Sequence, residues 1–282
     1  MKIKKMLFGL AAMGCAMVAP LAAQATPEQD LKEFQDYFKK KFPDVSFDEF
    51  SNGIYALPVA KDRREEWESI MEFPPFELEL EQGKTLWETP MKSGKTMASC
   101  FKNGGVNIVQ GYPYWDEATR QVRTLEMDIN ACRKRNGEAE FTDLNKGPLA
   151  TVAAYMKSLS KGQRIKLDLS SAGAQEAFEK GKNFYWGRRG QLNFACAHCH
   201  VGNAGKFIRG NILSTGLGHG AGFPTYRADW GYIGTLHHRY AGCNNQVRAK
   251  PLKPQSEEYR ALELYETYMN TGLPLTAPSH RP

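Results

Sequence analysis

The chain has 282 residues, of which 24% are charged and 41% hydrophobic, and its formal net charge is +6 at pH 7. A chain of this length buries a substantial core and has room for two domains. The small positive charge, to which three lysines among the first five residues contribute, does not indicate a nucleic-acid partner. Alternating β-branched runs are few, whereas residues 148–159 and 256–269 carry apolar side chains at helical spacing, so we expect a mainly α protein.

The first segment in chain order has the pattern of an export signal. Three lysines precede an apolar stretch from Met6 to Leu21, and Ala23-Gln24-Ala25 has the small residues of a cleavage site. The apolar stretch is too short and too poorly flanked for a stable membrane span. We therefore predict a signal peptide over residues 1–25 and a protein that works in the periplasm.

Residues 26–75 follow the signal and are rich in charged and aromatic side chains, for example between Phe34 and Phe42. Nothing in this composition indicates a role of its own. We interpret the segment as an N-terminal extension that packs on the domains after it.

Residues 196–200 carry the most specific chemical signal of the chain. Cys196-Ala197-His198-Cys199-His200 is a C-x-x-C-H motif, in which the two thiols form thioethers to haem vinyl groups and the last histidine ligates the iron. C-x-x-C also forms half of many zinc sites. Because the sequence has no second C-x-x-C or spaced His pair to complete a zinc site, we predict one covalently bound haem c on Cys196, Cys199 and His200.

The chain contains an internal repeat around this motif. Matching segments occur in the same order in both halves: Glu81-Gln82-Gly83-Lys84 and Glu179-Lys180-Gly181-Lys182, Gly111-Tyr112-Pro113 and Gly222-Phe223-Pro224, Thr124-Leu125 and Thr235-Leu236, Cys132 and Cys243. The last three pairs share one offset of 111 residues. Short matches also arise from composition, but their common order indicates two tandem c-type cytochrome-like domains, which we place at 76–165 and 166–282.

The first copy has lost the haem motif. Met97 and Phe101 stand where the second copy has its first cysteine and its histidine, so we expect the first domain to hold no haem. Cys100 and Cys132 would be a liability as exposed thiols in an oxidising compartment, and a disulfide between them stabilises the fold by roughly 3 to 4 kcal/mol through loop entropy. We predict this disulfide; two free buried thiols are the alternative.

Cys243 is left without a partner once two thioethers and one disulfide have formed. An odd cysteine in an exported protein indicates a chemical role. It lies in a stretch rich in basic and amide groups, where Arg239, Arg248 and Lys250 favour the thiolate, the form that binds metals and attacks electrophiles. We interpret the stretch as a haem-facing loop with a reactive thiol; Arg239, four residues earlier, shares the face of Cys243 if the segment is helical.

The second axial ligand of the iron is not decided by spacing. The candidates are Cys243, His198, His219, His237, His238 and Met269. His198 lies between the haem cysteines and belongs to the proximal side, whereas His237, His238 and Met269 are all suitable ligand types. The repeat favours Cys243, because its counterpart Cys132 sits where the vacant first pocket would close.

These residues resemble the SoxA family of the SoxAX cytochromes of sulfur oxidation. The resemblance covers nearly the whole chain after the signal. It rests on the approach Arg188-Arg189-Gly190-Gln191-Leu192-Asn193 to the haem motif, on Cys243-Asn244-Asn245-Gln246-Val247-Arg248, and on the helical region from Leu262 to Gly272. Many members carry two haems, and this chain departs from them at Met97 and Phe101, so it resembles the single-haem type.

The resemblance implies an activity, a ligand set and partners. His200 and Cys243 would ligate the haem iron, with Cys243 as a thiolate that in this family is typically a persulfide. The reaction would be that of an L-cysteine S-thiosulfotransferase: oxidative coupling of thiosulfate to a cysteine of the SoxYZ carrier, with electrons passing to the monohaem cytochrome SoxX in a heterodimer. For the thiosulfate dianion we expect Arg239 and Arg248, then Lys250, as binding or catalytic cations, although Arg248 also suits a haem propionate.

Two other functions compete with this interpretation. The chain can be a simple periplasmic electron-transfer cytochrome c, with Met269 or a histidine on the iron and Cys243 merely buried. It can also be a scaffold whose partner performs all the chemistry. The first predicts that Cys243→Ala keeps the distal ligand and the ferric spectrum of the wild type. The second predicts that Cys243→Ser retains thiosulfate turnover in the reconstituted complex.

Overall fold

The structure is a computed structural model that describes residues 25–282. The predicted signal peptide lies outside the described residues, except for Ala25. Helices dominate the described chain: α1 (Pro27–Lys41), α2 (Lys61–Glu72), α3 (Glu77–Glu88), α4 (Leu125–Arg135), α5 (Pro148–Ser158), α6 (Ala172–Trp186), α7 (Leu236–Gln246) and α8 (Glu257–Met269). The prediction of a mainly α protein is confirmed.

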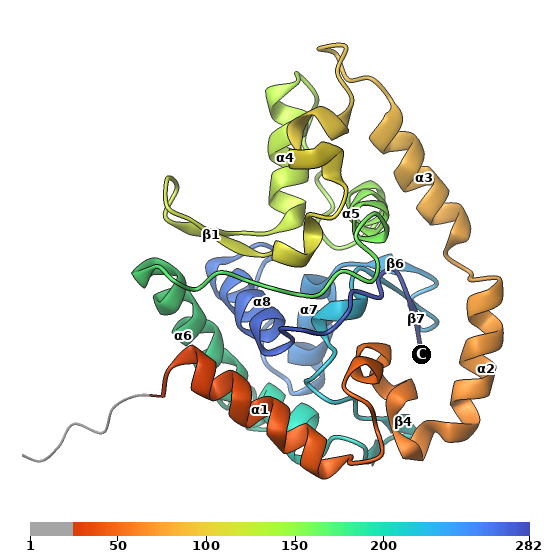
Figure 1. Ribbon diagram of the computed structural model, residues 1–282, viewed down its shortest axis with the longest axis vertical. Helices are drawn as coiled ribbons and strands as arrows, with labels where there is room; N and C mark the ends of the chain where they lie inside the picture. The colour runs from red at the N-terminus through yellow and green to blue at the C-terminus, as the bar shows by residue number, and fades with distance from the viewer. Residues whose placement is uncertain (1–24) are drawn as a thin grey trace, which may run out of the picture.

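The strands are short and pair locally. They are β1 (Tyr114–Asp116), β2 (Gln121–Arg123), β3 (Phe207–Ile208), β4 (Asn211–Ile212), β5 (Thr225–Arg227), β6 (Tyr232–Gly234) and β7 (His280–Arg281). Antiparallel hairpins join β1 to β2, β3 to β4 and β5 to β6. The final strand β7 adds to β5 in parallel, which places the last residues of the chain beside the β5–β6 hairpin (Figure 1).

The internal repeat is a repeat of structure. The elements β1, β2 and α4 recur 111 residues later as β5, β6 and α7, and the peptide bonds before Pro113 and Pro224 are both cis. A threonine caps the helix in each copy: the hydroxyl of Thr124 accepts from the Met127 amide, and that of Thr235 from the His238 amide. The chain thus contains two tandem cytochrome c-like domains, and the first lacks the C-x-x-C-H motif.

Each domain is built on a close crossing of two helices, α3 with α5 and α6 with α8. The repeated glycine lies at the crossing in both. A Cβ on Gly83 would stand 2.2 Å from the Thr151 carbonyl oxygen, and one on Gly181 would stand 2.0 Å from the Ala261 carbonyl oxygen. Only glycine lets the backbones approach this closely, which explains why the repeated segments keep this residue.

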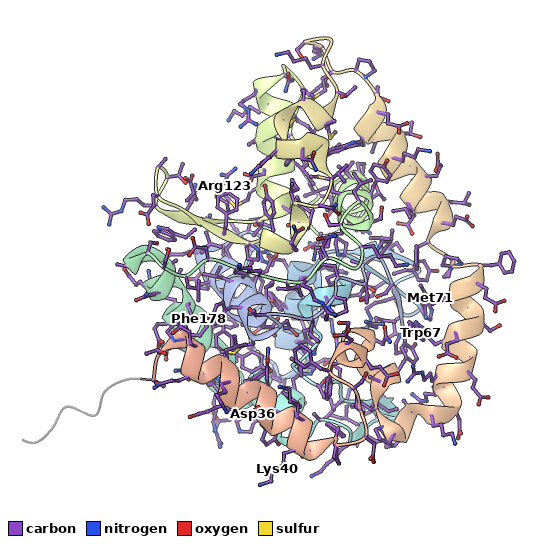
Figure 2. The ribbon with its side chains drawn as sticks, viewed as in Figure 1. Asp36, Lys40, Trp67, Met71, Arg123 and Phe178 are labelled. Carbon is purple, nitrogen blue, oxygen red and sulfur yellow. A yellow bond between two sulfur atoms is a disulfide. The ribbon has the colours of Figure 1, made fainter. Side chains whose placement is uncertain are left out.

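The residues before the first domain cover the second one. Helix α1 packs on α8, and its buried Phe34 lies edge-on to Tyr185 of α6, while Asp36 and Lys40 point to solvent (Figure 2). A capping box at Thr26 begins this helix. The N-terminal extension is therefore packed on the fold, as its aromatic content predicted.

The vacant first domain is closed by a disulfide. Cys100 and Cys132 are bonded, with their Cα atoms 5.8 Å apart and a sequence separation of 32. Cys132 is fully buried on α4, within the main hydrophobic core. The predicted disulfide is confirmed, and it occupies the position that Cys243 holds in the second domain.

The two domains contact each other at the base of α7. The Thr235 amide donates to the Asn145 carbonyl at 2.8 Å, and the Ile233 amide donates to the Glu79 carboxylate at 3.0 Å. One hydrophobic core runs through both domains. Within residues 25–282, no helix has the length and apolar character needed to cross a membrane.

Candidate functional site

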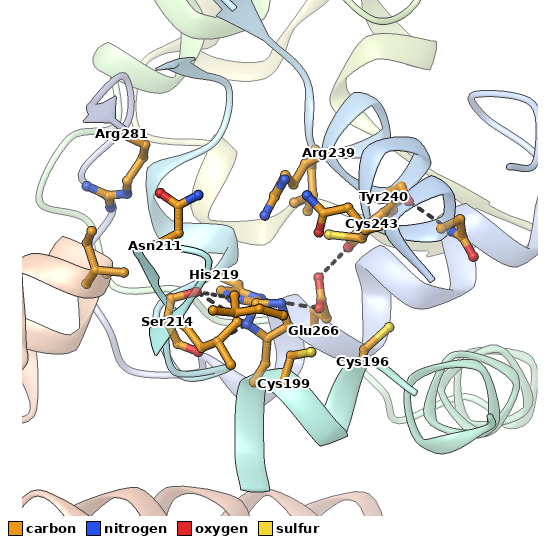
Figure 3. A pocket seen from close by; sticks show the side chains of 18 of the residues that line it. Cys196, Cys199, Asn211, Ser214, His219, Arg239, Tyr240, Cys243, Glu266 and Arg281 are labelled. Carbon is orange, nitrogen blue, oxygen red and sulfur yellow. Dashed lines mark hydrogen bonds and ion pairs between the residues drawn. The ribbon is translucent and has the colours of Figure 1, made fainter. Parts of the chain in front are cut away.

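A cavity of about 220 Å³ opens in the second domain, among the haem motif, α7 and the end of the chain. Its walls include Cys196, Cys199, His200, Arg239 and Cys243. Figure 3 shows Cys243 across the cavity from Cys199. The three cysteines are unpaired, so their sulfur atoms are available for covalent chemistry or ligation.

The approach to the motif is fixed by Arg189. Its backbone pairs with Phe194 through two hydrogen bonds, of 2.9 and 3.2 Å. Its guanidinium lies 3.6 Å from the Phe184 ring centroid and 3.6 Å from the Cys196 Sγ. The loop thereby holds Cys196 beside α6, and burial raises the pKa of the Cys196 thiol to about 12.

His200 is held with one nitrogen facing a backbone acceptor. Its Nδ1 lies 3.1 Å from the Ser214 carbonyl oxygen, to which it donates, so Nε2 is the unprotonated nitrogen. Burial, reinforced by His219 beside it, lowers the pKa of His200 well below its ordinary value. A neutral imidazole oriented through Nδ1 is the state in which histidine binds a metal.

A hydrogen-bonded chain supports this histidine from behind. Ser214 Oγ contacts His219 Nε2 at 2.8 Å, and His219 Nδ1 contacts the Glu266 carboxylate at 3.4 Å. Tyr240 donates to the same carboxylate at 2.5 Å. Our reading of the sequence missed Glu266 and Tyr240, because they lie on α8 and α7 and no local spacing relates them to His200.

Helix α7 carries Cys243 and Arg239 into the cavity together. The segment from 236 to 246 is a helix and not the loop we expected, since Thr235 caps it and its residues keep helical hydrogen bonds. Arg239 lies one turn before Cys243, and both line the cavity. The face-sharing predicted from their spacing is therefore present.

The other two predicted cations lie elsewhere. Arg248 and Lys250 follow the end of α7, and both are exposed. The Arg248 backbone is in the left-handed region at φ 57°, and its carbonyl accepts from the Gln191 amide at 3.3 Å. Within the described chain, the residues that line the cavity do not include Arg248 or Lys250.

The rival axial ligands are also placed away from the cavity or on its proximal side. His237 is buried, accepts from the Gln255 amide at 2.9 Å and contacts Glu263 at 3.0 Å. His238 contacts Tyr232 at 3.2 Å, and Met269 is buried outside the cavity wall.

The remaining histidines belong to the side of the haem motif. The ring of His219 lies 4.2 Å from that of His200, on the same side of the cavity. His198 uses its Nδ1 to accept from the Ala195 amide at 3.0 Å. Among the candidates, Cys243 is the one that lies in the cavity opposite the motif.

The structure adds two arginines that we did not single out. Arg227 on β5 and Arg281 on β7 line the same cavity. Burial lowers the pKa of each guanidinium to about 10. Only the pairing of the last strand with β5 brings Arg281 here, so no sequence pattern around Cys243 could have indicated it.

The donor set fits a covalently bound haem. Two free thiols at thioether spacing, an imidazole with its Nε2 unprotonated, and a cysteine opposite them share one cavity. His200, Cys196, Cys199 and Cys243 would hold the group. The first domain offers no such set, because its cysteines are bonded to each other.

Comparisons with known proteins identify the family of the chain. A family model described as "SoxA/TsdA, cytochrome c domain" matches residues 82–165. The matched residues belong to the copy without the haem motif, which confirms that this copy is a cytochrome c domain.

Curated relatives match across nearly the whole chain. The "L-cysteine S-thiosulfotransferase subunit SoxA" of Chlorobaculum tepidum is 49% identical over 92% of this chain and 89% of its own length. The protein of the same name from Allochromatium vinosum is 49% identical over 94% of this chain and 93% of its own. Among solved structures, the "Crystal structure of SoxXA from P. pantotrophus" matches with a TM-score of 0.68 and 30% identity, covering 74% of this chain and 79% of that one.

Proposed function

This chain belongs to the SoxA family of L-cysteine S-thiosulfotransferase subunits, and we propose from that premise that it couples thiosulfate to a cysteine of a carrier protein. It is the catalytic haem subunit of the complex that performs this reaction. A cytochrome that only transfers electrons is not favoured, because the relatives that match over most of the chain are named as transferases.

One observation carries the assignment to particular residues: Cys243 and Arg239 share the cavity of the haem motif. His200 and Cys243 would ligate the haem iron, and Cys196 and Cys199 would attach one haem c covalently. When bound, the haem supplies a one-electron acceptor next to the Cys243 sulfur.

The coupling balances as a two-electron oxidation followed by an exchange. The Cys243 thiolate and thiosulfate would form a sulfur–sulfur bond and give Cys243–S–S–SO3⁻, with the two electrons accepted one at a time by a bound haem that a partner cytochrome reoxidises. A carrier thiolate then attacks the outer sulfane sulfur. The carrier leaves as its S-thiosulfonate, and the Cys243 thiolate is restored.

The protein's own charges assist both steps. Arg239 stands one helical turn from the sulfur and offers a guanidinium fork to the sulfonate oxygens. Arg248 and Lys250 lie at the exposed end of α7. We assign them the outer part of the approach and not the catalytic position.

The partners follow from the family. We propose a heterodimer with the monohaem cytochrome SoxX, since the matching solved structure is titled as a SoxXA complex. The carrier would be SoxYZ, and the location the periplasm, after removal of residues 1–25. For the described part of the chain we place the extension at 26–75 and the domains at 76–165 and 166–282.

The decisive experiment replaces the Cys243 sulfur. We expect Cys243→Ser to retain its covalent haem, to lose the thiolate signature in the electron paramagnetic resonance spectrum, and to lose thiosulfate coupling to the carrier. Met269→Leu removes a rival ligand and should keep both. Retained coupling in Cys243→Ser would refute the catalytic role, and an unchanged ligand field would refute the axial assignment.

A further inference from the structure

Arg227 and Arg281 are direct neighbours across the parallel pair of β5 and β7. Their Cα positions are paired in register, so both side chains leave the same face of the strands. Both line the cavity that contains Cys243. Two cations that are 54 positions apart in sequence are thus placed side by side.

The Arg281 guanidinium packs closely against the backbone at Gly53 and Gly222. A Cβ on Gly53 would lie 3.1 Å from its Nε, and one on Gly222 would lie 2.9 Å from its Nη2. The side chain donates to the carbonyls of His280 at 3.2 Å and Ser51 at 3.0 Å. These two bonds leave several of its N–H groups without a partner.

Arg227 is poorly neutralised. Its guanidinium lies 5.2 Å from the Trp230 ring centroid, and it has one ion pair, of 3.3 Å, with the Asp229 carboxylate, whose side chain is 68% exposed. Its buried Nε has no hydrogen-bond partner. Since a buried cation without a close counter-charge is costly, the pair provides a site for an anion.

The pair lies at the end of the cavity remote from the haem thiols. Figure 3 shows Arg281 and Asn211 at one side of the cavity, away from Cys196 and Cys199. Arg239 and Cys243 lie on a third side, above the two haem-motif cysteines in this view. A haem carries its vinyl groups and its two propionates on opposite edges. Thioether attachment at Cys196 and Cys199 would therefore leave the propionate edge on the side of the cavity where Arg281 lies.

We propose that Arg227 and Arg281 form a carboxylate-binding pair that receives the haem propionates, which leaves Arg239 as the cation for thiosulfate. This inference rests on the proposed function for its haem and its substrate. It assigns the two kinds of anion in this cavity to different arginines.

The test is resonance Raman spectroscopy of the holoprotein, because the propionate bending mode responds to hydrogen bonds at the carboxylates. We expect this mode to shift in Arg281→Gln and in Arg227→Gln, and to keep its position in Arg239→Gln. Arg209→Gln removes the same charge from an exposed residue outside the cavity wall and serves as the matched control. Arg281→Lys keeps the charge without the planar fork and should give a smaller shift.

Thiosulfate kinetics distinguish whether the Arg227–Arg281 pair binds the haem propionates or thiosulfate. We expect KM for thiosulfate to change less than twofold in Arg281→Gln and Arg227→Gln. An unchanged propionate mode in both variants overturns the proposal, and a simultaneous tenfold rise in KM would assign the pair to thiosulfate instead. Haem content and thermal unfolding show that each variant is folded, and the Cys243→Ser result decides the proposed function separately.

Discussion

Arg239 and Cys243 lie on the same face of helix α7, one turn apart. The Thr235 cap fixes where the helix begins, and four residues of spacing then place both side chains on the cavity face. His200 meets them from the other side, with its Nδ1 on Ser214. The chemistry of the cavity depends on which side chains line it and on how each side chain is oriented.

Loss of the Arg239 guanidinium should weaken the handling of thiosulfate. A hydrogen bond to a charged group contributes about 1.5–3 kcal/mol, so we expect Arg239→Gln to lower kcat/KM about tenfold to a hundredfold. The haem spectrum should keep its thiolate signature. Steady-state kinetics with Arg209→Gln as control check this, and equal kinetics for the two variants would contradict it.

Each domain contains one close crossing of two helices, α3 with α5 in the first and α6 with α8 in the second. Gly181 on α6 and Gly83 on α3 occupy equivalent positions, and each faces a carbonyl of the crossing helix. The haem motif begins ten residues after α6 ends, so the α6–α8 crossing sets the frame for the cavity.

Adding one methyl group at the crossing should destabilise the protein. We expect Gly181→Ala to lower the free energy of unfolding by about 1–3 kcal/mol, because overpacking outweighs the better helix propensity of alanine. Glu176→Ala, on the exposed side of α6, should change it by no more than about 0.5 kcal/mol. Denaturant titration of both variants measures the difference, and a more stable Gly181→Ala would show that the helices can separate at no cost.

The whole molecule uses its first domain as a haem-free structural unit. The Cys100–Cys132 bond spans 32 residues, so its removal in Cys100→Ser/Cys132→Ser should lower the free energy of unfolding by roughly 3–4 kcal/mol. The proposed haem site lies in the other domain, so the haem should keep its spectrum below the unfolding temperature. Calorimetry tests the first expectation; an altered haem spectrum in the folded variant would contradict the second.

A buried acidic group at the domain interface should make stability depend on pH. Glu126 faces Lys157, Glu263 and His237, and one of its carboxylate oxygens has no hydrogen-bond partner. Burial, assisted by Glu263, raises the pKa of Glu126 above its ordinary value of 4.5.

The sign of the effect follows from this shift. The folded state holds the Glu126 proton more tightly than the unfolded state, so stability falls as pH rises from the unfolded pKa through the folded one. Glu126→Gln should therefore be more stable than the wild type at pH 7, with a difference that shrinks toward pH 4. Unfolding titrations between these pH values check this, and a variant less stable at pH 7 would show that the carboxylate is charged and paired.

The sequence by itself determined the features that depend on local spacing. The C-x-x-C-H motif and the recurrence at 111 residues are properties of the chain itself, whatever its packing. The four-residue step from Arg239 to Cys243 indicated a shared face only for a helix, and the structure supplied that helix. The recurrence predicted the two domains, and the helical spacing of apolar residues at 148–159 and 256–269 predicted the mainly α fold. The two cysteines left in the copy without the haem motif predicted the Cys100–Cys132 disulfide.

Only the tertiary structure decided which distant residues meet. It placed Cys243 opposite the motif while giving His237 other partners, moved Arg248 outside the cavity wall, and joined Arg281 to Arg227 through β7. The physical reason is that side chains far apart in sequence come together through the packing of whole helices and strands. Spacing along the chain does not predict these contacts.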